Sequence, residues 1–590
     1  MKFLQRTVNC GELNESNVDQ IVVLNGWVNI KRDLGSLVFI DIRDRYGITQ
    51  LVIECETNDT AAKIALDIKS EYVIAAKGKV RKRENPNKNI PTGMIEVVVD
   101  ELQIINKADL PPFEIAGENE ASEELRLKYR YLDLRRNKIQ NKLLVRNEVY
   151  KIIHDYYYEN GFVEVETPVL MKSTPEGARD FLVPSRINKS KFYALPQSPQ
   201  IFKQILMVSG YDRYMQIVKC FRDEDLRSDR QPEFTQIDIE MSFINQDDII
   251  EVNENFIKNL WEKVLNYDVQ TPFPRLSYKD AMSRFGSDKP DQRFGMELIS
   301  IKDLVLNSEF VVFKSVIESD GDIVALNAKG CAKYSRKQID DLTEYAKKYG
   351  AKGLAWIKIQ DGEIKSPIAK FLSEDELNSI IKQTNLEEND LLLISSDTWT
   401  KACKIQGALR LKVAKDEGII DNLKDVFHFS WVVDFPLFEK DEESGQIYAM
   451  HHPFTSPHPD DLDILNEDHT KARALAHDMV INGHEVGGGS IRIHDSSVQS
   501  KMFSLLGLTD EDANDKFGFL LDALKYGAPP HGGIAFGLDR LVMLLSGTDN
   551  IRDVIAFPKT TSGLSLMDGS PSFVDDNQLA ELGVQLLKNK

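Results

Sequence analysis

The chain has 590 residues, of which 42% are hydrophobic and 28% are charged. This length is too great for one hydrophobic core, and the composition is typical of a globular protein with several domains. No run of eighteen apolar residues occurs, and residues 1–7 lack the apolar stretch of a signal peptide, so we expect no membrane segment. Five scattered cysteines without metal-binding spacing indicate neither a disulfide framework nor a zinc site, and they favour the reducing cytoplasm.

The net charge of −20 argues against a nucleic-acid partner, but this charge is unevenly distributed. Residues 1–110 contain 15 Lys/Arg and 16 Asp/Glu, so nearly all of the excess negative charge lies in the rest of the chain. Within this first segment a basic run, 77–83, follows a strand-like stretch, 72–76. Such a run is commonly a solvated strand end, yet on an acidic protein it also permits contacts with phosphates.

Residues 1–105 consist of short strand-like stretches separated by turn residues. The clearest stretches are 21–28, 36–43 and 95–99. One helical stretch, at about 59–70, interrupts them. Several strands and one helix predict an OB-fold β-barrel, which binds single-stranded nucleic acid with one sheet face and its loops. Phe39 is the candidate stacking platform of this barrel, unless its ring belongs to the barrel core.

A linker and then an α+β domain follow. Residues 106–136 include Pro111-Pro112 and an acidic stretch, which together indicate a linker or hinge. From 137 to 160 apolar residues recur at helical spacing, and an extended segment that ends at Pro168 comes next. The strands expected to form an antiparallel sheet are 191–195, 214–221 and 234–243.

An insertion is predicted to interrupt this domain. Residues 287–425 mix helix signals, as at 336–347, with strand signals, as at 353–358, and carry no nucleotide-binding signature. The sheet pattern resumes at 430–435, and the chain ends in a helix predicted at 577–588. The expected divisions are therefore 137–286 and 426–565 for the two parts of the α+β domain, 287–425 for an inserted α/β domain and 566–590 for a C-terminal extension.

Two arginines more than three hundred residues apart are the most informative residues. Arg222 stands in the stretch 221–224 at the end of a strand pattern, and Arg540 closes the stretch 537–540 between a glycine-rich strand and a helix. A guanidinium matches phosphate oxygens in both geometry and charge, so the pair could clamp opposite ends of a bent ATP. Taken one at a time, each would be an ion-paired surface arginine.

The segment 478–489 contains a predicted β-hairpin. Asn482-Gly483 between alternating residues predicts a two-residue turn, which pairs residue 480 with residue 485. Strand alternation then gives one face of the hairpin Asp478, Val480, Glu485 and Gly487. Two converging carboxylates suit a hard cation that carries triphosphate oxygens, although two solvent-facing carboxylates would give the same pattern.

Other polar side chains occur near these signatures. Glu176 stands in a loop with proline and glycine that could close over a ligand. Gln200 and Lys203 are three residues apart and would share one face of a helix. His451 and His452 precede a proline without a third residue at metal-binding spacing, so zinc is not expected, and each could be a structural histidine.

Three of these stretches resemble the three signatures of class II aminoacyl-tRNA synthetases: the segment ending at Pro168, the strand with Arg222 and the junction with Arg540. An OB-like domain before the catalytic sheet is similar to the aspartate, asparagine and lysine subgroup. The longer stretches that resemble bacterial-type aspartyl-tRNA synthetases, together with the insertion, are 193–200, 450–457 and 517–524. The resemblance covers essentially the whole chain.

The resemblance implies the activity of an aspartate–tRNA ligase. Such an enzyme activates L-aspartate with ATP to give aspartyl-adenylate and pyrophosphate, and then transfers aspartate to the 3′ end of tRNA(Asp). The resemblance further implies Mg²⁺ as cofactor, and a homodimer formed through the helix before Pro168 and the extended segment after it. The first reaction needs no general base because a carboxylate is already nucleophilic at neutral pH, and positioning and charge stabilisation lower its barrier.

The resemblance also implies roles for individual residues. The implied ATP site consists of Arg222, Asp223, Glu224, Gln231, Phe234, Glu485, Gly537, Leu538, Asp539 and Arg540. The implied aspartate site consists of Glu176, Gln200, Lys203, Arg222, Asp238, His451 and Arg492. Asp478 and Glu485 would hold Mg²⁺, and the residues with catalytic roles would be Arg222, Arg540 and Lys203. The positions that would bind the anticodon are Arg32, Phe39, Gln50 and Glu96.

Within this implied site, Phe234 and Arg540 would stack on the adenine, and Arg222 would hold the α-phosphate. Arg492 and Lys203 would pair with the side-chain carboxylate of aspartate, helped by His451. The residues implied around the ammonium group of aspartate are Glu176, Gln200 and Asp238. An asparagine amide could not compensate the two cations, which would cost about 3–5 kcal/mol.

Two alternatives remain open from the sequence. Ile30 stands where relatives tend to have a basic residue, which puts one anticodon contact in doubt, whereas Leu34 resembles the version that charges only tRNA(Asp). A relaxed enzyme that also charges tRNA(Asn) is therefore the first alternative. The second is a noncatalytic tRNA-binding paralogue, which should have lost some of the residues that this chain retains: Arg222, Glu485, Arg492 and Arg540.

Overall fold

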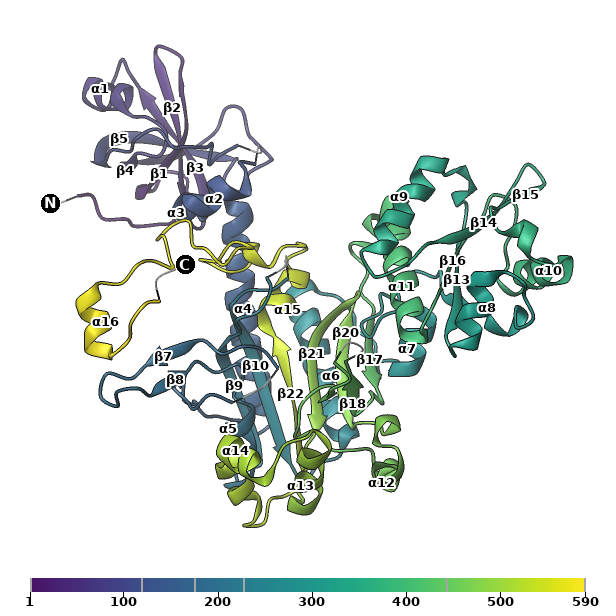
Figure 1. Ribbon diagram of the computed structural model, residues 1–590. Helices are drawn as coiled ribbons and strands as arrows, with labels where there is room; N and C mark the ends of the chain where they lie inside the picture. The colour runs from purple at the N-terminus through teal and green to yellow at the C-terminus, as the bar shows by residue number, and fades with distance from the viewer. Residues whose placement is uncertain (1–2, 118–119, 175–176, 227–228, 442–443, 588–590) are drawn as a thin grey trace. The chain divides into compact units, whose positions relative to one another are not determined.

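The computed structural model describes residues 3–117, 120–174, 177–226, 229–441 and 444–587 (Figure 1). The chain divides into two compact units. The first unit consists of Met1–Asn147, Leu226–Gln231 and Asn550–Val574. The second unit consists of Glu148–Asp225, Pro232–Asp549 and Asp575–Lys590. The six predicted domain divisions stay predictions.

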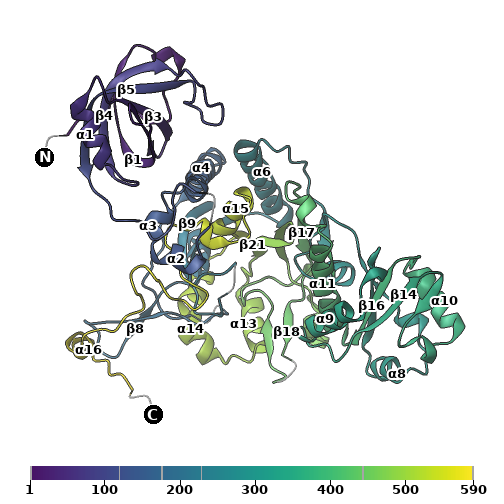
Figure 2. The same cartoon turned by 90° about the horizontal axis from the view of Figure 1, so that it is seen from above.

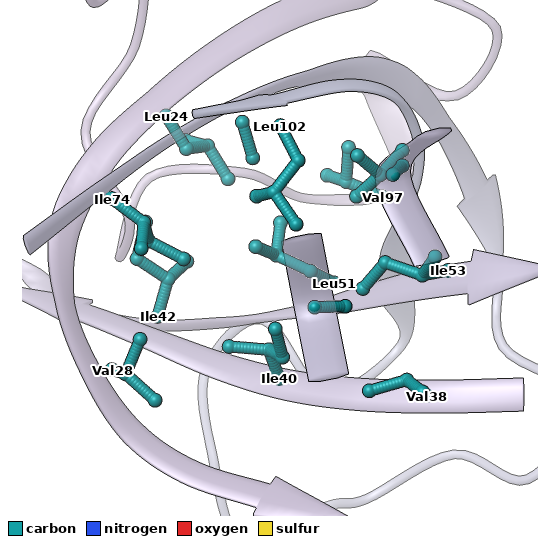
Figure 3. Close-up of a cluster of buried hydrophobic side chains, with 14 of the residues drawn as sticks. Leu24, Val28, Val38, Ile40, Ile42, Leu51, Ile53, Ile74, Val97 and Leu102 are labelled. Atoms are coloured by element: carbon teal, nitrogen blue, oxygen red, sulfur yellow. The ribbon is translucent and has the colours of Figure 1, made fainter. Parts of the chain in front are cut away.

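A closed five-stranded barrel forms the N-terminal part of the first unit, with the strand order β1-β2-β3-β5-β4. Its strands are β1 (Ile21–Asp33), β2 (Leu37–Asp44), β3 (Gly47–Glu54), β4 (Val73–Lys82) and β5 (Ile95–Asn106). Helix α1 (Asp59–Asp67) lies between β3 and β4 in the chain. The alternating apolar residues of these strands fill the barrel interior (Figure 3). This architecture confirms the predicted OB-fold.

The side chain of Phe39 is not part of that core. Its neighbours Val38 and Ile40 are fully buried in the barrel interior, and β-strand alternation turns Phe39 to the outer face, where it is half-buried. The sequence left both placements open, and the ring lies where an aromatic platform is needed.

The predicted linker contains two short helices that its composition did not indicate, α2 (Glu123–Lys128) and α3 (Arg130–Asp133). The buried Arg130 guanidinium pairs with Asp133 at 2.6 Å and donates to three backbone carbonyls of residues 552–556. Lys142 pairs with Asp553 at 2.6 Å. These buried charges are all hydrogen-bonded, so they join segments more than four hundred residues apart in the sequence into one unit.

An eight-stranded sheet organises the second unit, with the order β11-β17-β20-β21-β22-β10-β9-β6. Its strands are β6 (Val163–Glu164), β9 (Arg213–Phe221), β10 (Glu233–Ser242), β11 (Arg275–Ser277), β17 (Phe429–Val433), β20 (Ala476–Ile481), β21 (His484–Ile491) and β22 (His531–Gly537). The sheet is antiparallel except at its two edge strands, β6 and β11, which pair in parallel. The predicted antiparallel catalytic sheet is confirmed.

Helices cover both faces of this sheet. The helices of this part are α4 (Asn137–Glu159), α5 (Gln200–Val208), α6 (Gln246–Leu265), α7 (Tyr278–Phe285), α13 (Ser496–Leu505), α14 (Asp510–Leu524) and α15 (Leu538–Leu545). On one face, Phe256 of α6 packs between Tyr157 of α4 and Phe536 of β22, with ring centroids 5.0 and 5.7 Å away. Figure 2 shows α4 and α6 on one side of the sheet and α13 and α14 on the other.

The insertion forms a separate five-stranded sheet with the order β12-β13-β16-β14-β15. Its strands are β12 (Leu298–Ser300), β13 (Asp322–Ala328), β14 (Ala355–Gln360), β15 (Glu363–Lys365) and β16 (Leu391–Asp397), and its helices are α8 (Val311–Glu318), α9 (Arg336–Lys347), α10 (Glu374–Gln383) and α11 (Trp399–Asp416). One apolar cluster includes residues of α9 and α11, and another includes residues of α8 and α10. The insertion thus mixes helices and strands as predicted, but all pairs of its sheet are antiparallel, so the arrangement is α+β and not α/β.

The last helix is shorter than the sequence pattern predicted. Helix α16 spans Asp576–Leu582, and the described residues 583–587 are not helical; residue 588, the end of the predicted helix, lies outside the described residues. Gly583 caps it in the left-handed conformation, with φ at 69°. Glycine adopts this conformation without steric cost and commonly ends helices. The prediction of a helix that continues past Gly583 was therefore wrong. Among the described residues, no helix combines the length and apolar character needed to cross a bilayer.

Candidate active site

A cavity of about 460 Å³ opens within the second unit. Helix α5, strands β10, β20, β21 and β22, the end of β9 and the segment 450–455 all contribute to its lining. The predicted site residues that line it are Gln200, Lys203, Arg222, Glu224, Asp238, His451, Asp478, Glu485 and Arg492. The fold therefore brings into one cavity side chains that are up to 292 positions apart in the sequence.

Two buried cations and two buried carboxylates form a cluster at this cavity, and three of these side chains, Lys203, Asp238 and Arg492, line it. Lys203 Nζ lies 3.0 Å from Asp238 Oδ1 and 3.3 Å from Glu240 Oε2. Arg492 contacts the same Glu240 with Nε at 3.0 Å and Nη2 at 3.2 Å. All four side chains are at least 95% buried. Glu240 is therefore a shared counter-charge that holds the ammonium and the guanidinium next to each other.

The charge state of this cluster follows from its contacts. Burial works to raise the pKa of Glu240, but Arg492 and Lys203 outweigh it and keep that pKa below the usual value. Burial raises the pKa of Asp238, and Lys203 opposes this shift only in part. Asp238 Oδ2 accepts no hydrogen bond within the described residues. Glu240 is thus the firm anion of the cluster, while Asp238 presents an unsatisfied carboxyl oxygen.

Local structure explains this arrangement. Strand alternation puts Gln236, Asp238 and Glu240 on the face of β10 that α5 covers, and Lys203 lies one turn into α5. A Cβ at Gly533 on the neighbouring strand β22 would collide with Oε2 of Glu240. The absence of a side chain at Gly533 therefore makes room for the shared carboxylate.

The Asn482-Gly483 turn forms as predicted, with residue 480 opposite residue 485. A β-bulge between Met479 and Val480 then shifts the register of β20 against β21 by one residue. Asp478 therefore lies opposite Gly488. The prediction that Gly487 shares the face of Asp478 was wrong, because a Cβ at Gly487 would meet the Phe536 ring of the core. A Cβ at Gly488 would instead lie 2.8 Å from Asp478 Oδ1 and 3.6 Å from Glu485 Oε1.

These two carboxylates fit a divalent cation. Gly488 brings their oxygens together without a side chain between them, and Asp478 Oδ1 is buried without a hydrogen-bond partner in the described part of the chain. His451 Nε2 lies 3.4 Å from this oxygen. Burial raises the pKa of Asp478 to about 6, and Glu485 and Asp288 add to the shift while His451 opposes it. A carboxylate whose charge is this poorly compensated suits a bound cation.

The remaining predicted nucleotide residues lie near the end of β9 and the start of α15. The guanidinium of Arg222 lies over the Phe234 ring, 5.0 Å from its centroid. Arg540 donates from Nη1 to the backbone carbonyl of Glu485. Gly537 precedes α15, and Leu538 is buried. Phe234 therefore lies beside Arg222. Arg540 lies beside the β20–β21 hairpin, which carries Asp478 and Glu485.

Some predicted residues have other surroundings. Asp539 is buried and its Oδ2 accepts the backbone N–H of Thr235 at 2.9 Å. Asp223 is exposed, 3.7 Å from Arg179. The Gln231 amide belongs to the first unit, where it donates to the Lys559 carbonyl and accepts from the Lys559 N–H. Glu176 lies outside the described residues.

The four predicted anticodon residues lie together on the outer face of the barrel. Phe39 lies opposite Arg32 in the β1–β2 pairing. Gln50 Oε1 accepts from Arg32 at 3.0 Å, and Gln50 Nε2 donates to Glu96 at 2.9 Å. Two residues of the basic run 77–83, which were not predicted to bind the anticodon, complete this network: Arg83 donates to Gln50 at 2.7 Å, and Arg81 donates to Glu96 at 2.8 Å. The amide of Gln50 is therefore held in one orientation.

Sequence reasoning missed two residues that line the cavity, His452 and Asp288, and one that contacts its lining residues, Glu240. Glu240 carried a usable signal, because polar residues at 236, 238 and 240 alternate with apolar ones in an otherwise buried strand. His452 was considered but left undecided; it is half-buried and lines the cavity, and desolvation with nearby Arg492 and Lys203 lowers its pKa to about 3. Asp288 is an exposed loop residue at the cavity, and no local pattern marked it.

Comparison with known proteins bears on this geometry. Residues 122–561 match the family described as tRNA synthetases class II (D, K and N), and residues 22–105 match the OB-fold nucleic acid binding domain. The aspartate–tRNA ligase of Ruminiclostridium cellulolyticum is 55% identical over 588 residues, which cover 99% of each chain. The chain belongs to the aspartate–tRNA ligase family. This confirms the predicted family and enzyme class.

Other aspartate–tRNA ligase relatives and solved structures add detail. The aspartate–tRNA(Asp/Asn) ligase of Caldanaerobacter subterraneus is 54% identical over 585 residues, which cover 99% of this chain and 98% of that protein. The crystal structure of asparaginyl-tRNA synthetase from Pyrococcus horikoshii, complexed with asparaginyl-adenylate, has a TM-score of 0.59 at 19% identity and covers 95% of this chain and 99% of that one. This second likeness shows the fold alone. Class II synthetases use ATP as a substrate.

Proposed function

We propose that this protein activates L-aspartate with ATP and transfers it to the 3′ end of tRNA(Asp). The observation that carries the proposal is a cavity that combines two buried cations, Lys203 and Arg492, with Arg222 and a pair of convergent carboxylates. Formation of aspartyl-tRNA from purified tRNA(Asp), labelled L-aspartate and ATP tests it. A purified protein that binds these substrates but forms no aspartyl-tRNA would contradict the proposal.

Arg492 has donors available for the side chain of aspartate. A guanidinium has five N–H donors. Glu240 accepts from two of the nitrogens and Ser490 Oγ accepts from the third, Nη1, at 2.6 Å. Two N–H groups thus remain for a carboxylate, beside the ammonium of Lys203. An asparagine amide would leave this charge without compensation, at a cost of about 3–5 kcal/mol.

The first reaction follows from the positions of the charges. The α-carboxylate of aspartate attacks the α-phosphorus of ATP in line, the bond to the β-phosphate oxygen breaks and pyrophosphate leaves. Arg222, with Phe234 under its guanidinium, would stabilise the charge that develops on the α-phosphate. Gln200 and Asp238 would hold the ammonium group of aspartate, the latter through its unsatisfied Oδ2. The terminal ribose hydroxyl of tRNA then attacks the adenylate carbonyl, and AMP leaves.

Asp478 and Glu485 would hold Mg²⁺, which when bound neutralises the triphosphate oxygens. Replacing Asp478 by asparagine should raise the Mg²⁺ concentration for half-maximal ATP–pyrophosphate exchange by more than about tenfold. Loss of a residue that only supports a ligand already lowers metal affinity by roughly tenfold, and Asp478 would be a direct ligand. A Mg²⁺ titration of the exchange rate measures this. Glu439→Gln, which alters an exposed carboxylate on β18 (Phe438–Lys440), is the matched control. An unchanged titration midpoint for Asp478→Asn would exclude Asp478 as a ligand.

The residues on the outer face of the barrel, Arg32, Phe39, Gln50 and Glu96, would bind the anticodon. Replacing Glu96 by alanine removes the acceptor of both Gln50 and Arg81. The loss should cost about 1.5–3 kcal/mol of transition-state stabilisation, so kcat/KM for tRNA(Asp) should fall roughly 10- to 150-fold. Aspartate-dependent exchange, which needs no tRNA, should stay unchanged. Glu101→Ala, an exposed change on the same strand, is the control for the aminoacylation assay. Equal losses in both assays would place Glu96 in a purely structural role.

Strict specificity for tRNA(Asp) is part of the proposal. Leu34, 70% exposed at the turn between β1 and β2, supports it. The alternative is a relaxed enzyme, because relatives with both kinds of name are similar to this chain. Comparison of turnover on purified tRNA(Asp) and tRNA(Asn) separates the two, and equal charging would favour the alternative.

We also propose that the protein is a cytoplasmic homodimer. The five cysteines are all free thiols, which suits a reducing compartment. Helix α4 and the extended segment through Pro168 match the dimer-forming signature of the family, and Val163, Val169 and Leu170 of this segment are exposed in the single chain. Sedimentation that shows only a 67.1 kDa species would refute the dimer.

A further inference from the structure

A narrow β-hairpin extends from the second unit and takes no part in the cavity chemistry. Strand β7 (Leu182–Pro184) pairs with β8 (Phe192–Ala194), with Pro184 opposite Phe192. Residues 185–191 connect the two strands and are called the hairpin tip. The Ser185 N–H donates to the Lys191 carbonyl at 2.9 Å, which closes the tip. Both views show the hairpin extending as an arm from the catalytic sheet, with helix α16 close to its outer end (Figures 1 and 2).

The base of this hairpin is part of the cavity rim. Ala178 and Gln197, which flank the two strands, both line the cavity. The Gln197 amide accepts from the Ala178 N–H at 3.0 Å and donates to the Ala178 carbonyl at 2.8 Å and to Asp180 Oδ1 at 2.6 Å. The hairpin is therefore anchored where a substrate enters. The tip begins at Ser185, seven positions after Ala178, which is a span of up to about 23 Å in an extended strand.

The tip carries concentrated positive charge on an acidic protein. Arg186, Lys189 and Lys191 are all exposed, and residues 181–211 contain no Asp or Glu, although the chain has 93 of them. Lys203 is the only other cation in that stretch, and it is buried. Within the described part of the chain none of the three tip cations forms an ion pair: the recorded pairs all involve other residues. A solvated strand end would explain one such cation, but three in a stretch that itself contains no carboxylate produce a local field that attracts polyanions.

We propose that the hairpin tip binds backbone phosphates of the acceptor arm of tRNA while the 3′ end enters the cavity. This inference rests on the proposed function. The single-stranded 3′ end has to reach the cavity, whereas a double-stranded stem is too wide for a space of about 460 Å³ and must stop outside it. The tip cations lie outside the rim, where that stem would be. Double-stranded RNA is recognised mainly through its shape and its phosphates, which exposed Lys and Arg side chains contact without reading sequence.

The test compares binding of two RNA fragments by the full-length protein. In the tip variant, Arg186→Gln, Lys189→Gln and Lys191→Gln are combined. Loss of three phosphate contacts should reduce the slope of log K against log salt for an acceptor-stem minihelix by about 2–3, and affinity at 0.15 M salt should fall roughly 10- to 100-fold. Affinity for an anticodon stem-loop and aspartate-dependent ATP–pyrophosphate exchange should stay as in the wild type.

A matched control removes three exposed cations elsewhere. Lys314→Gln, Lys337→Gln and Lys382→Gln change the net charge equally and lie in the insertion. This control should leave minihelix affinity and its salt slope unchanged. The proposal is overturned if the tip variant binds the minihelix like the wild type, if the control lowers affinity as much, or if both RNA fragments lose affinity equally. A changed sedimentation coefficient of the tip variant with normal minihelix binding would assign the tip to contact with a second copy instead.

The outcome is separable from that of the proposed function. If the wild type shows no aspartate-dependent exchange but its minihelix binding depends on the three cations, the aspartate activity fails and the RNA contact stands. If exchange and charging are normal while the tip variant behaves like the wild type, only the hairpin proposal fails.

Discussion

Replacing Arg492 by leucine should abolish aspartate-dependent ATP–pyrophosphate exchange while largely sparing ATP binding. The substitution removes the two N–H groups that would donate to the side-chain carboxylate of aspartate, and it leaves Glu240 with Lys203 as its main counter-charge. Loss of one partner from a buried ion pair costs about 3–5 kcal/mol, so kcat/KM for aspartate should fall by roughly two to four orders of magnitude. Steady-state exchange at varied aspartate concentration measures the change.

Two controls separate this effect from misfolding. Arg473→Leu removes a half-exposed arginine that pairs with Asp461 at 2.8 Å, and it should leave exchange unchanged. ATP affinity and the thermal unfolding midpoint of Arg492→Leu show whether the rest of the site persists. Arg492→Lys should recover little activity, because an ammonium cannot make the paired contacts of a guanidinium. Unchanged exchange in Arg492→Leu would remove Arg492 from its proposed role.

Replacing Arg222 by alanine should mainly lower kcat. Preorganised donors that meet developing charge contribute about 2.7–4 kcal/mol to the transition state, so kcat for exchange should fall roughly 100- to 1000-fold. The cation–π contact with Phe234, worth about 0.5–1 kcal/mol at an accessible site, is lost as well and should weaken ATP binding only slightly. Pre-steady-state formation of aspartyl-adenylate measures the chemical step directly.

Lys219→Ala is the matched control for Arg222. Lys219 is exposed on β9, three residues before Arg222, which directly follows this strand, so its loss should change neither kcat nor KM. Arg222→Lys should resemble Arg222→Ala, because a single ammonium does not reproduce the planar pair of donors. A fall confined to KM for ATP, with normal kcat, would mean that Arg222 binds ground state and transition state equally.

Local patterns in the sequence were sufficient for much of the site. The Asn482-Gly483 turn and the shared helix face of Gln200 and Lys203 follow from turn chemistry and from the period of the helix. These features depend on neighbours within a few residues. The resemblance to a family, and not the local patterns, linked them into one cavity.

Features that depend on distant neighbours were missed or wrongly placed. The bulge that turns Gly488 and not Gly487 towards Asp478 depends on how β21 packs against β22, and strand alternation alone gives the wrong face. The central role of Glu240 depends on Arg492, which lies 252 positions further along the chain. The burial of Asp539 and its hydrogen bond with the Thr235 N–H likewise come from tertiary packing. The short sequence stretch 537–540 alone does not predict them.

Aspartate-dependent exchange of pyrophosphate into ATP by the purified wild-type protein tests the central claim most directly. We expect exchange with L-aspartate and Mg²⁺, without tRNA, and none above background when L-asparagine replaces L-aspartate. Exchange with asparagine at a comparable rate, or no exchange with aspartate, would contradict a cavity whose buried Arg492 and Lys203 select a second carboxylate.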